Sequence, residues 1–160
     1  METMKGNHIR DDLRELQSSQ GMRPAHMETL QREKLGELLL YCVHQVPAYK
    51  DLQHLIPEIQ ADPFEAIKKF PILRKRDFQE NPMNWLADGK DPGELIPNKT
   101  GGSTGEPVTF YMDRHAVEYY EAARWRGLSW WGITPGSPSI MLWGNPRETG
   151  KVQEKKYQLK

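Results

Sequence analysis

The chain contains 160 residues, with 22 basic and 22 acidic side chains and a formal net charge of zero. This length is enough for one hydrophobic core but too short for a two-domain enzyme. Without net charge the chain has no overall field to attract nucleic acid or an anionic membrane, so we expect neither as a partner. Cys42, the only cysteine, excludes an intrachain disulfide and a thiolate metal site and favours a reducing, cytoplasmic setting.

Residues 1–26 are polar and are interrupted by Gly21 and Pro24. They lack the apolar core of a signal peptide, and no stretch of the chain approaches the roughly 18 apolar residues that span a bilayer. We therefore expect a soluble protein whose first 26 residues are a loosely ordered leader or contain one short helix over residues 11–17.

Residues 27–93 are expected to be helical. An apolar stripe at helical spacing predicts a long helix that Pro47 ends. Short helical pieces separated by prolines follow, and Asp62 before Pro63 is a typical helix start. A basic cluster in the same region could contact a phosphate, although a solvated surface is the favoured interpretation. The stripe consists of Leu35, Leu38, Leu39, Cys42, Val43 and Val46, and the cluster of Lys68, Lys69, Arg74, Lys75 and Arg76.

Strand patterns appear after residue 93. Residues 94–98 predict a strand that Pro97 confines to a sheet edge, and residues 108–112 predict a second strand rich in β-branched and aromatic side chains. The apolar run 139–143 predicts a strand covered on both faces, as in a parallel sheet.

Between the second and third predicted strands, Asp113 is placed to cap a helix that Gly132 ends. Strand, helix and strand together indicate the beginning of an α/β sheet, followed by a charged tail at residues 151–160. The apolar positions of this helix are Val117, Tyr120, Leu128 and Trp131.

The segment between the first two strands, residues 100–107, reads TGGSTGEP. Its three glycines permit positive φ angles and let backbone N–H groups approach an anion, while its three hydroxyl side chains add donors for phosphate oxygens. No lysine follows the last glycine, which excludes a P-loop of the GxxxxGK[ST] type. The pattern GxGxxG is absent, which excludes the dinucleotide-binding fingerprint. A polyphosphate loop is the interpretation we develop, and a hairpin turn without a ligand is its alternative.

The sequence TGGSTGEPV resembles the phosphate-loop signature of adenylate-forming enzymes. Residues 46–49 (VPAY), 70–75 (FPILRK) and 131–136 (WGITPG) are similar to phenylacetate-coenzyme A ligases and their capsule-biosynthesis relatives. The resemblance covers residues 27 to 145. It implies an α/β fold in which a helical N-terminal segment precedes the start of the ATP-binding domain, residues 94–150, with an incomplete sheet.

The resemblance also implies a two-step reaction. A carboxylate attacks the α-phosphorus of Mg-ATP to give an acyl-adenylate and pyrophosphate, and a thiol, usually coenzyme A, then displaces AMP. The loop would act on the β- and γ-phosphates by positioning and charge stabilisation. The residues implied to hold these phosphates are Thr100, Gly101, Gly102, Ser103, Thr104 and Gly105, and Pro107 matches the proline of the family's loop.

Two positions depart from the family's pattern. Gly101 stands where many members have serine, and Val108 stands where a lysine often follows the loop proline. Lys99, immediately before the loop, is our candidate for a substitute cation, and its alternative is a lysine that is simply exposed to solvent.

The enzymes that this sequence resembles are more than twice as long and carry downstream an adenine motif, a ribose-binding aspartate, a magnesium-binding acid and a domain with a catalytic lysine. We therefore expect an N-terminal fragment that is inactive alone and whose acyl substrate is not encoded here. The first alternative is a non-catalytic module that binds a nucleotide or anion, or that pairs with a partner or with itself through the unfinished sheet. The second alternative is a structural fragment without a ligand.

Tryptophans and histidines supply the remaining candidates. Trp125, Trp130, Trp131 and Trp143 could line an acyl pocket, although core packing is favoured. His44, His54 and His115 lack the spacing of metal ligands, so no metal site is expected. His115, near the start of the last helix, is a minor candidate for substrate contact.

Overall fold

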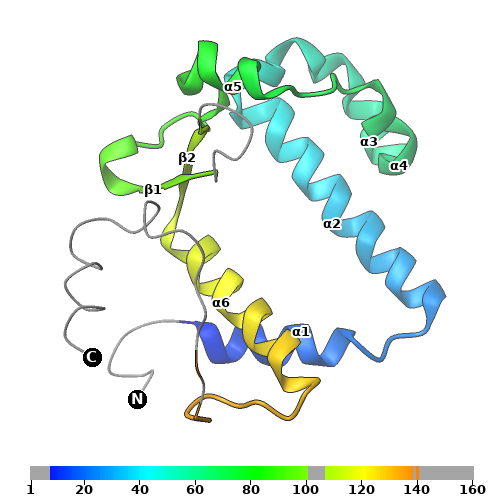
Figure 1. The fold of residues 1–160 in the computed structure, drawn as a ribbon. Coiled ribbons are helices and arrows are strands. Elements are labelled where there is room, and N and C mark those ends of the chain that lie inside the picture. The colour runs from blue at the N-terminus through cyan, green and yellow to red at the C-terminus, as the bar shows by residue number, and fades with distance from the viewer. Residues whose placement is uncertain (1–7, 101–106, 139, 141–160) are drawn as a thin grey trace.

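The computed structural model describes residues 8–100, 107–138 and 140. These residues are mostly helical and include one small antiparallel sheet, which agrees with a mixed α/β composition (Figure 1). The elements are, in order, α1 Ile9–Ser19, α2 Pro24–Gln45, the 3-10 helix η1 Pro47–Leu55, α3 Ile56–Ala61, α4 Pro63–Ala66, η2 Ile67–Lys69, α5 Lys75–Glu80, η3 Pro82–Trp85, η4 Pro92–Glu94, β1 Ile96–Lys99, β2 Thr109–Met112 and α6 Arg114–Ser129.

The main core lies at the C-terminal end of α2, where the short helices fold back against it (Figure 1). Val43 on α2 and Ile59 on α3 are almost completely buried, at 0% and 1% exposure. The long helix and its buried side chains were predicted, but Leu38 is 56% exposed because the short helices cover only the neighbouring face of α2. The core cluster consists of Leu39, Val43, Leu55, Ile59 and Ala66.

Prolines divide the chain after α2 into short helices, as predicted. Pro47 and Pro63 occupy first-turn positions, where a missing N–H costs no helical hydrogen bond. The predicted cap at Asp62 is confirmed, because its carboxylate accepts the N–H of Phe64 at 3.0 Å. The Arg32 guanidinium at 2.7 Å and this backbone donor hold the pKa of the Asp62 carboxyl below its ordinary value.

Helix α1 pairs with α6 although the two are far apart in the sequence (Figure 1). Residues 9–19 are a regular helix here, so of the two expectations for the leader the helix is the one observed, and it is longer than residues 11–17. The N–H of His8 donates to the Glu118 carboxylate at 3.0 Å, and Arg114 Nε donates to the same carboxylate at 2.8 Å. Both interactions hold the pKa of Glu118 below its ordinary value.

The docking of α1 changes which face of α6 is buried. The cap at Asp113 is confirmed, since its carboxylate accepts the Ala116 N–H at 2.7 Å. Tyr120 and Trp131 were predicted on the apolar stripe but are 62% and 82% exposed. Ala122 and Glu118 are buried instead, because a small side chain allows close packing of the two helices and the carboxylate has donors there.

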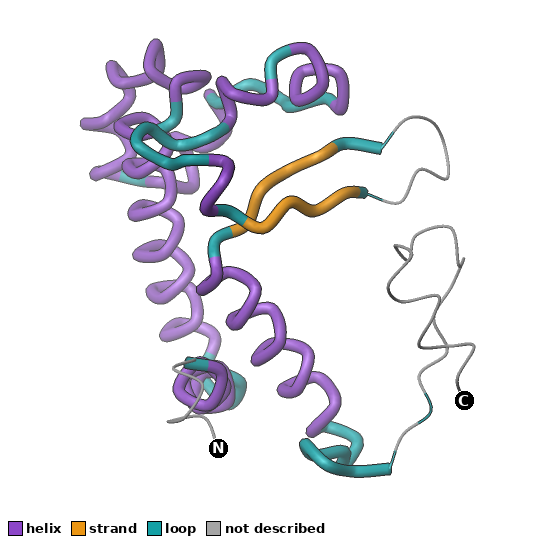
Figure 2. Tube along the Cα trace, turned by 90° about the vertical axis from the view of Figure 1, so that its left-hand side faces the viewer, coloured by secondary structure: helices purple, strands orange, loops and turns teal. Residues whose placement is uncertain are grey.

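Strands β1 and β2 form an antiparallel hairpin (Figure 2). Of the strand predicted at residues 139–143, the structure describes only Ile140, which lies in no strand and is 90% exposed instead of covered. The tail at 151–160 lies outside the described residues. Of the helices that the structure describes, none combines the length and apolar character needed to cross a bilayer.

Truncating Ile59 tests the main core. Ile59→Ala should lower the free energy of unfolding by about 2–5 kcal/mol, because a fully buried isoleucine leaves a cavity among packed neighbours. Ile72→Ala removes the same atoms from a side chain that is 90% exposed and should change stability by less than about 0.5 kcal/mol. Urea unfolding followed by circular dichroism gives both values, and equal losses would contradict this core assignment.

The lowered pKa of Glu118 makes the α1–α6 contact dependent on pH. A carboxyl group with a depressed folded-state pKa stabilises the fold above its ordinary pKa, and this contribution disappears as the pH falls through the depressed value. Glu118→Gln should therefore lower the melting temperature at pH 7 and lose that effect in strong acid. Glu33→Gln, at an exposed position of α2, is the control for the loss of a surface carboxylate and should change the melting temperature at pH 7 little. An equal Glu118→Gln effect at both pH values would refute the linkage.

Candidate phosphate-binding hairpin

The β1–β2 hairpin carries the predicted phosphate loop. Lys99 ends β1, Thr100 follows it, and Pro107 precedes the second strand. The other predicted phosphate-contacting residues lie outside the described residues, so the structure places the base of the loop rather than its tip. These residues are Gly101, Gly102, Ser103, Thr104 and Gly105.

The register of the hairpin explains how Pro97 fits into a strand. The pairs run from Ile96 with Met112 to Lys99 with Thr109, and Pro97 lies opposite Tyr111. Thr100 N–H donates to the Val108 carbonyl at 3.0 Å, which marks a hydrogen-bonded pair, and such pairs alternate with non-bonded ones along an antiparallel ladder. Pro97 therefore occupies a position where no ladder donor is needed.

Two hydrogen bonds close the base of the loop. Besides the bond from Thr100 N–H, the N–H of Val108 donates to the Thr100 hydroxyl oxygen Oγ1 at 3.0 Å. Val108 is only 8% exposed, although most residues around it on the hairpin are exposed. The two ends of the loop are thus held together by residues that flank it.

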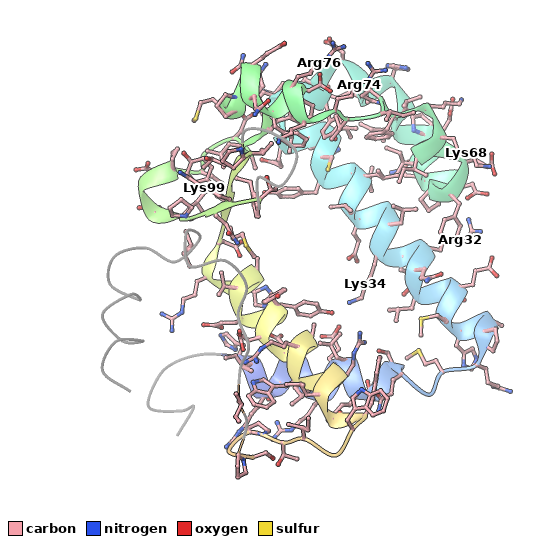
Figure 3. All side chains as sticks on the ribbon, in the orientation of Figure 1. Arg32, Lys34, Lys68, Arg74, Arg76 and Lys99 are labelled. Carbon is pink, nitrogen blue, oxygen red and sulfur yellow. The ribbon has the colours of Figure 1, made fainter. Side chains whose placement is uncertain are left out.

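Lys99 is exposed at the end of β1. Its backbone N–H is occupied by the Asn98 side-chain oxygen at 2.8 Å. Among the residues that the structure describes, no carboxylate pairs with the Lys99 ammonium group, and Figure 3 shows Lys99 on the hairpin while the other labelled cations lie on helices or their flanks. Lys99 therefore has the position and charge to meet an anion at the base of the loop.

The basic cluster at residues 68–76 has a different character. Lys68 pairs with Glu65 at 2.5 Å, Lys69 pairs with Glu58, and Arg76 lies 3.8 Å from an adjacent aspartate. The side chains of these lysines and of Arg76 are more than half exposed. Local ion pairs on an exposed surface agree with the solvated interpretation and leave this cluster out of the candidate site.

An aromatic cluster lies between the helical region and the hairpin. Trp85 contacts Phe78 in a tilted arrangement, with 4.8 Å between ring centroids, and meets Tyr49 edge to face at 5.6 Å. Tyr49 in turn contacts Phe70 at 5.5 Å, so residues from η1 to η3 converge here. A cavity of about 90 Å³ separates this cluster from β2, lined by Phe78, Pro82, Trp85, Leu86, Thr109, Phe110 and Tyr111.

Sequence reasoning considered other tryptophans and missed Trp85. Trp130 and Trp131 are 63% and 82% exposed, so the favoured prediction of core packing is wrong for both, and neither lies in a packed pocket. Trp143 lies outside the described residues. Trp125 is half-buried on α6, with the Arg124 guanidinium 5.0 Å from its ring. Trp85 could have been predicted from the aromatic residues that recur among the proline-separated helices, namely Tyr49, Phe70 and Phe78.

Asp88, in the segment between the aromatic cluster and β1, makes two contacts with the helical region. The Asp88 N–H donates to the Gln45 carbonyl at the end of α2, and the Asp88 carboxylate pairs with Lys50 at 2.8 Å. These contacts connect the approach to β1 directly to the helical core, so the hairpin starts from a fixed point.

The histidines were the remaining candidates for a site. Within the described residues, no group of three or more histidine, cysteine, aspartate or glutamate side chains is arranged to hold a metal ion. His115 faces α1, with Nε2 3.5 Å from Asp12, and its neighbour on α6 is Tyr119. His115 is therefore part of the α1–α6 contact, and we assign it no substrate contact.

No protein-family model matches the chain, and neither a curated protein nor a solved structure matches it. The likeness to phenylacetate-coenzyme A ligases consequently rests on the motifs in the sequence. The structural observation on the loop is the pair of hydrogen bonds between Thr100 and Val108 at its base.

Proposed function

We propose that this chain contributes the phosphate-binding loop of an ATP-dependent, AMP-forming acyl-coenzyme A ligase similar to phenylacetate-coenzyme A ligases. The observation that carries the proposal is the closed base of the hairpin, where two 3.0 Å hydrogen bonds join Thr100 and Val108 around a loop rich in glycine and hydroxyl side chains. A loop with fixed ends loses less conformational freedom on binding a ligand.

In this proposal the loop binds the β- and γ-phosphates of ATP. Its backbone N–H groups and the Ser103 and Thr104 hydroxyls donate to phosphate oxygens, and Lys99 adds a positive charge at the base. Pyrophosphate is the leaving group when a carboxylate attacks the α-phosphorus, so donors on these oxygens stabilise the charge that develops during the step.

Other parts of the proposed reaction have no counterpart in the described residues. They bring together no carboxylate cluster for magnesium, so we assign no metal ligand to this part of the chain. The finer fold proposal is that β1 and β2 belong to the start of the ATP-binding domain of such an enzyme. The contacts to the carboxylic acid and to the thiol would then come from residues outside this hairpin.

Nucleotide binding tests the proposal. By isothermal titration, the 160-residue chain should bind ATP and inorganic tripolyphosphate with similar affinity and AMP much more weakly, because the loop contacts only the outer phosphates. Replacing Ser103 and Thr104 together with alanine should weaken tripolyphosphate binding at least tenfold, since hydrogen bonds to charged groups contribute about 1.5–3 kcal/mol each.

Ser129→Ala is the matched control for these variants, because among the described residues the Ser129 hydroxyl donates to the Arg126 carbonyl of its own helix. It should leave binding unchanged. Equal affinity for AMP and ATP, or unchanged binding by the double variant, would refute the loop assignment. We expect no pyrophosphate release from ATP and a carboxylic acid by this chain alone.

A second candidate function is pairing with another chain through an exposed edge of the two-stranded sheet. The structure distinguishes the two hairpin edges: the outer edge of β1 has Pro97, without a donor, and Lys99, whose N–H is already bonded. On β2 the N–H groups of Thr109 and Tyr111 point away from β1 by the same alternation. The β2 edge is therefore the one suited to strand addition.

This second function predicts concentration-dependent association in sedimentation equilibrium. Thr109→Pro removes an outward donor at the β2 edge and should abolish the association while the helical circular dichroism signal persists. Thr134→Pro, in the turn after α6, controls for a general effect of proline. A wild-type chain that stays monomeric at high concentration would exclude the pairing function.

A further inference from the structure

Thr100 and Val108 face each other at the end of the ladder, but their second hydrogen bond is not a backbone pair. In a regular hydrogen-bonded pair, each residue donates its N–H to the other's carbonyl. Here Thr100 N–H donates to the Val108 carbonyl, while Val108 N–H donates to Thr100 Oγ1, each at 3.0 Å. The hydroxyl oxygen replaces the carbonyl oxygen of the same residue.

This replacement sets the point at which the chain leaves the sheet. Because Val108 N–H bonds to a side chain, the Thr100 carbonyl does not accept the ladder hydrogen bond that a regular pair would have at this position. Val108 is 8% exposed, so its N–H has little access to water and depends on Oγ1 as an acceptor. Loss of this acceptor would leave a buried donor unpaired.

The chemistry required of residue 100 is therefore specific. The side chain must carry an acceptor one carbon from Cα, which serine and threonine both provide and valine does not. Threonine is also restricted at χ1 by its branched Cβ, which holds the oxygen in one direction more firmly than serine. Thr109, one residue beyond Val108 on β2, has no hydroxyl contact of this kind among the described residues.

We propose that Thr100 is a positioning residue, whose hydroxyl oxygen closes the base of the loop through Val108 N–H and so sets the loop for phosphate, while Ser103 and Thr104 contact the phosphate. This inference rests on the proposed function. It changes the role of Thr100 from the phosphate ligand implied by the sequence resemblance to a support for the ligands.

Two measurements on the 160-residue chain separate the roles. Amide hydrogen exchange at Val108 is followed by NMR without ligand, and tripolyphosphate binding is measured by titration. Thr100→Val should accelerate Val108 exchange about tenfold or more, because its acceptor is lost, and should weaken tripolyphosphate binding several-fold. Thr100→Ser keeps the acceptor and should remain close to wild type in both measurements.

Ser103→Ala should weaken binding without changing Val108 exchange, and Thr109→Val should change neither. If Thr100→Val weakens binding while Val108 exchange is unchanged, Thr100 is a direct phosphate ligand and the positioning role is wrong. Faster exchange with unchanged binding would overturn it as well. Failure of the wild-type chain to bind tripolyphosphate would instead refute the proposed function, whatever the exchange data show.

Discussion

Burial of Val43 and Ile59 at the C-terminal end of α2 is the contact on which the described structure depends. Helices of four to nine residues, such as α4 and η1, are too short to be stable in isolation. The short helices η1, α3 and α4 persist because each places an apolar side chain against α2, where five buried residues form one cluster. Prolines at the helix starts set the directions in which these pieces turn back.

The hairpin depends on this core through contacts of a different kind. A two-stranded hairpin with exposed strands is marginally stable on its own. Trp85 and Phe78 provide an aromatic surface beside β2, and Asp88 binds both the end of α2 and Lys50. The base of the candidate loop is therefore positioned from one side by the helical core and closed from within by Thr100.

Helices α1 and α6 form the second contact region, and charge rather than apolar area distinguishes it. Glu118 is 7% exposed and has both a backbone and a guanidinium donor, whereas buried Asp12 has one oxygen without a hydrogen-bond partner among the described residues. Burying carboxylates is favourable only where donors compensate for lost hydration. The contact between α1 and α6 therefore depends on the hydrogen bonds that its buried carboxylate accepts.

Local signals in the sequence determined the helix starts at Asp62 and Asp113, the proline breaks and the two strands around the loop, because caps and turns depend on residues within a few positions. The tertiary structure alone decided which face of α6 is buried, since His8 and Glu118 are 110 residues apart. It also assigned the Thr100 hydroxyl to Val108. Composition shows that a hydroxyl is present, whereas its partner depends on strand register, which arises only when the two strands meet.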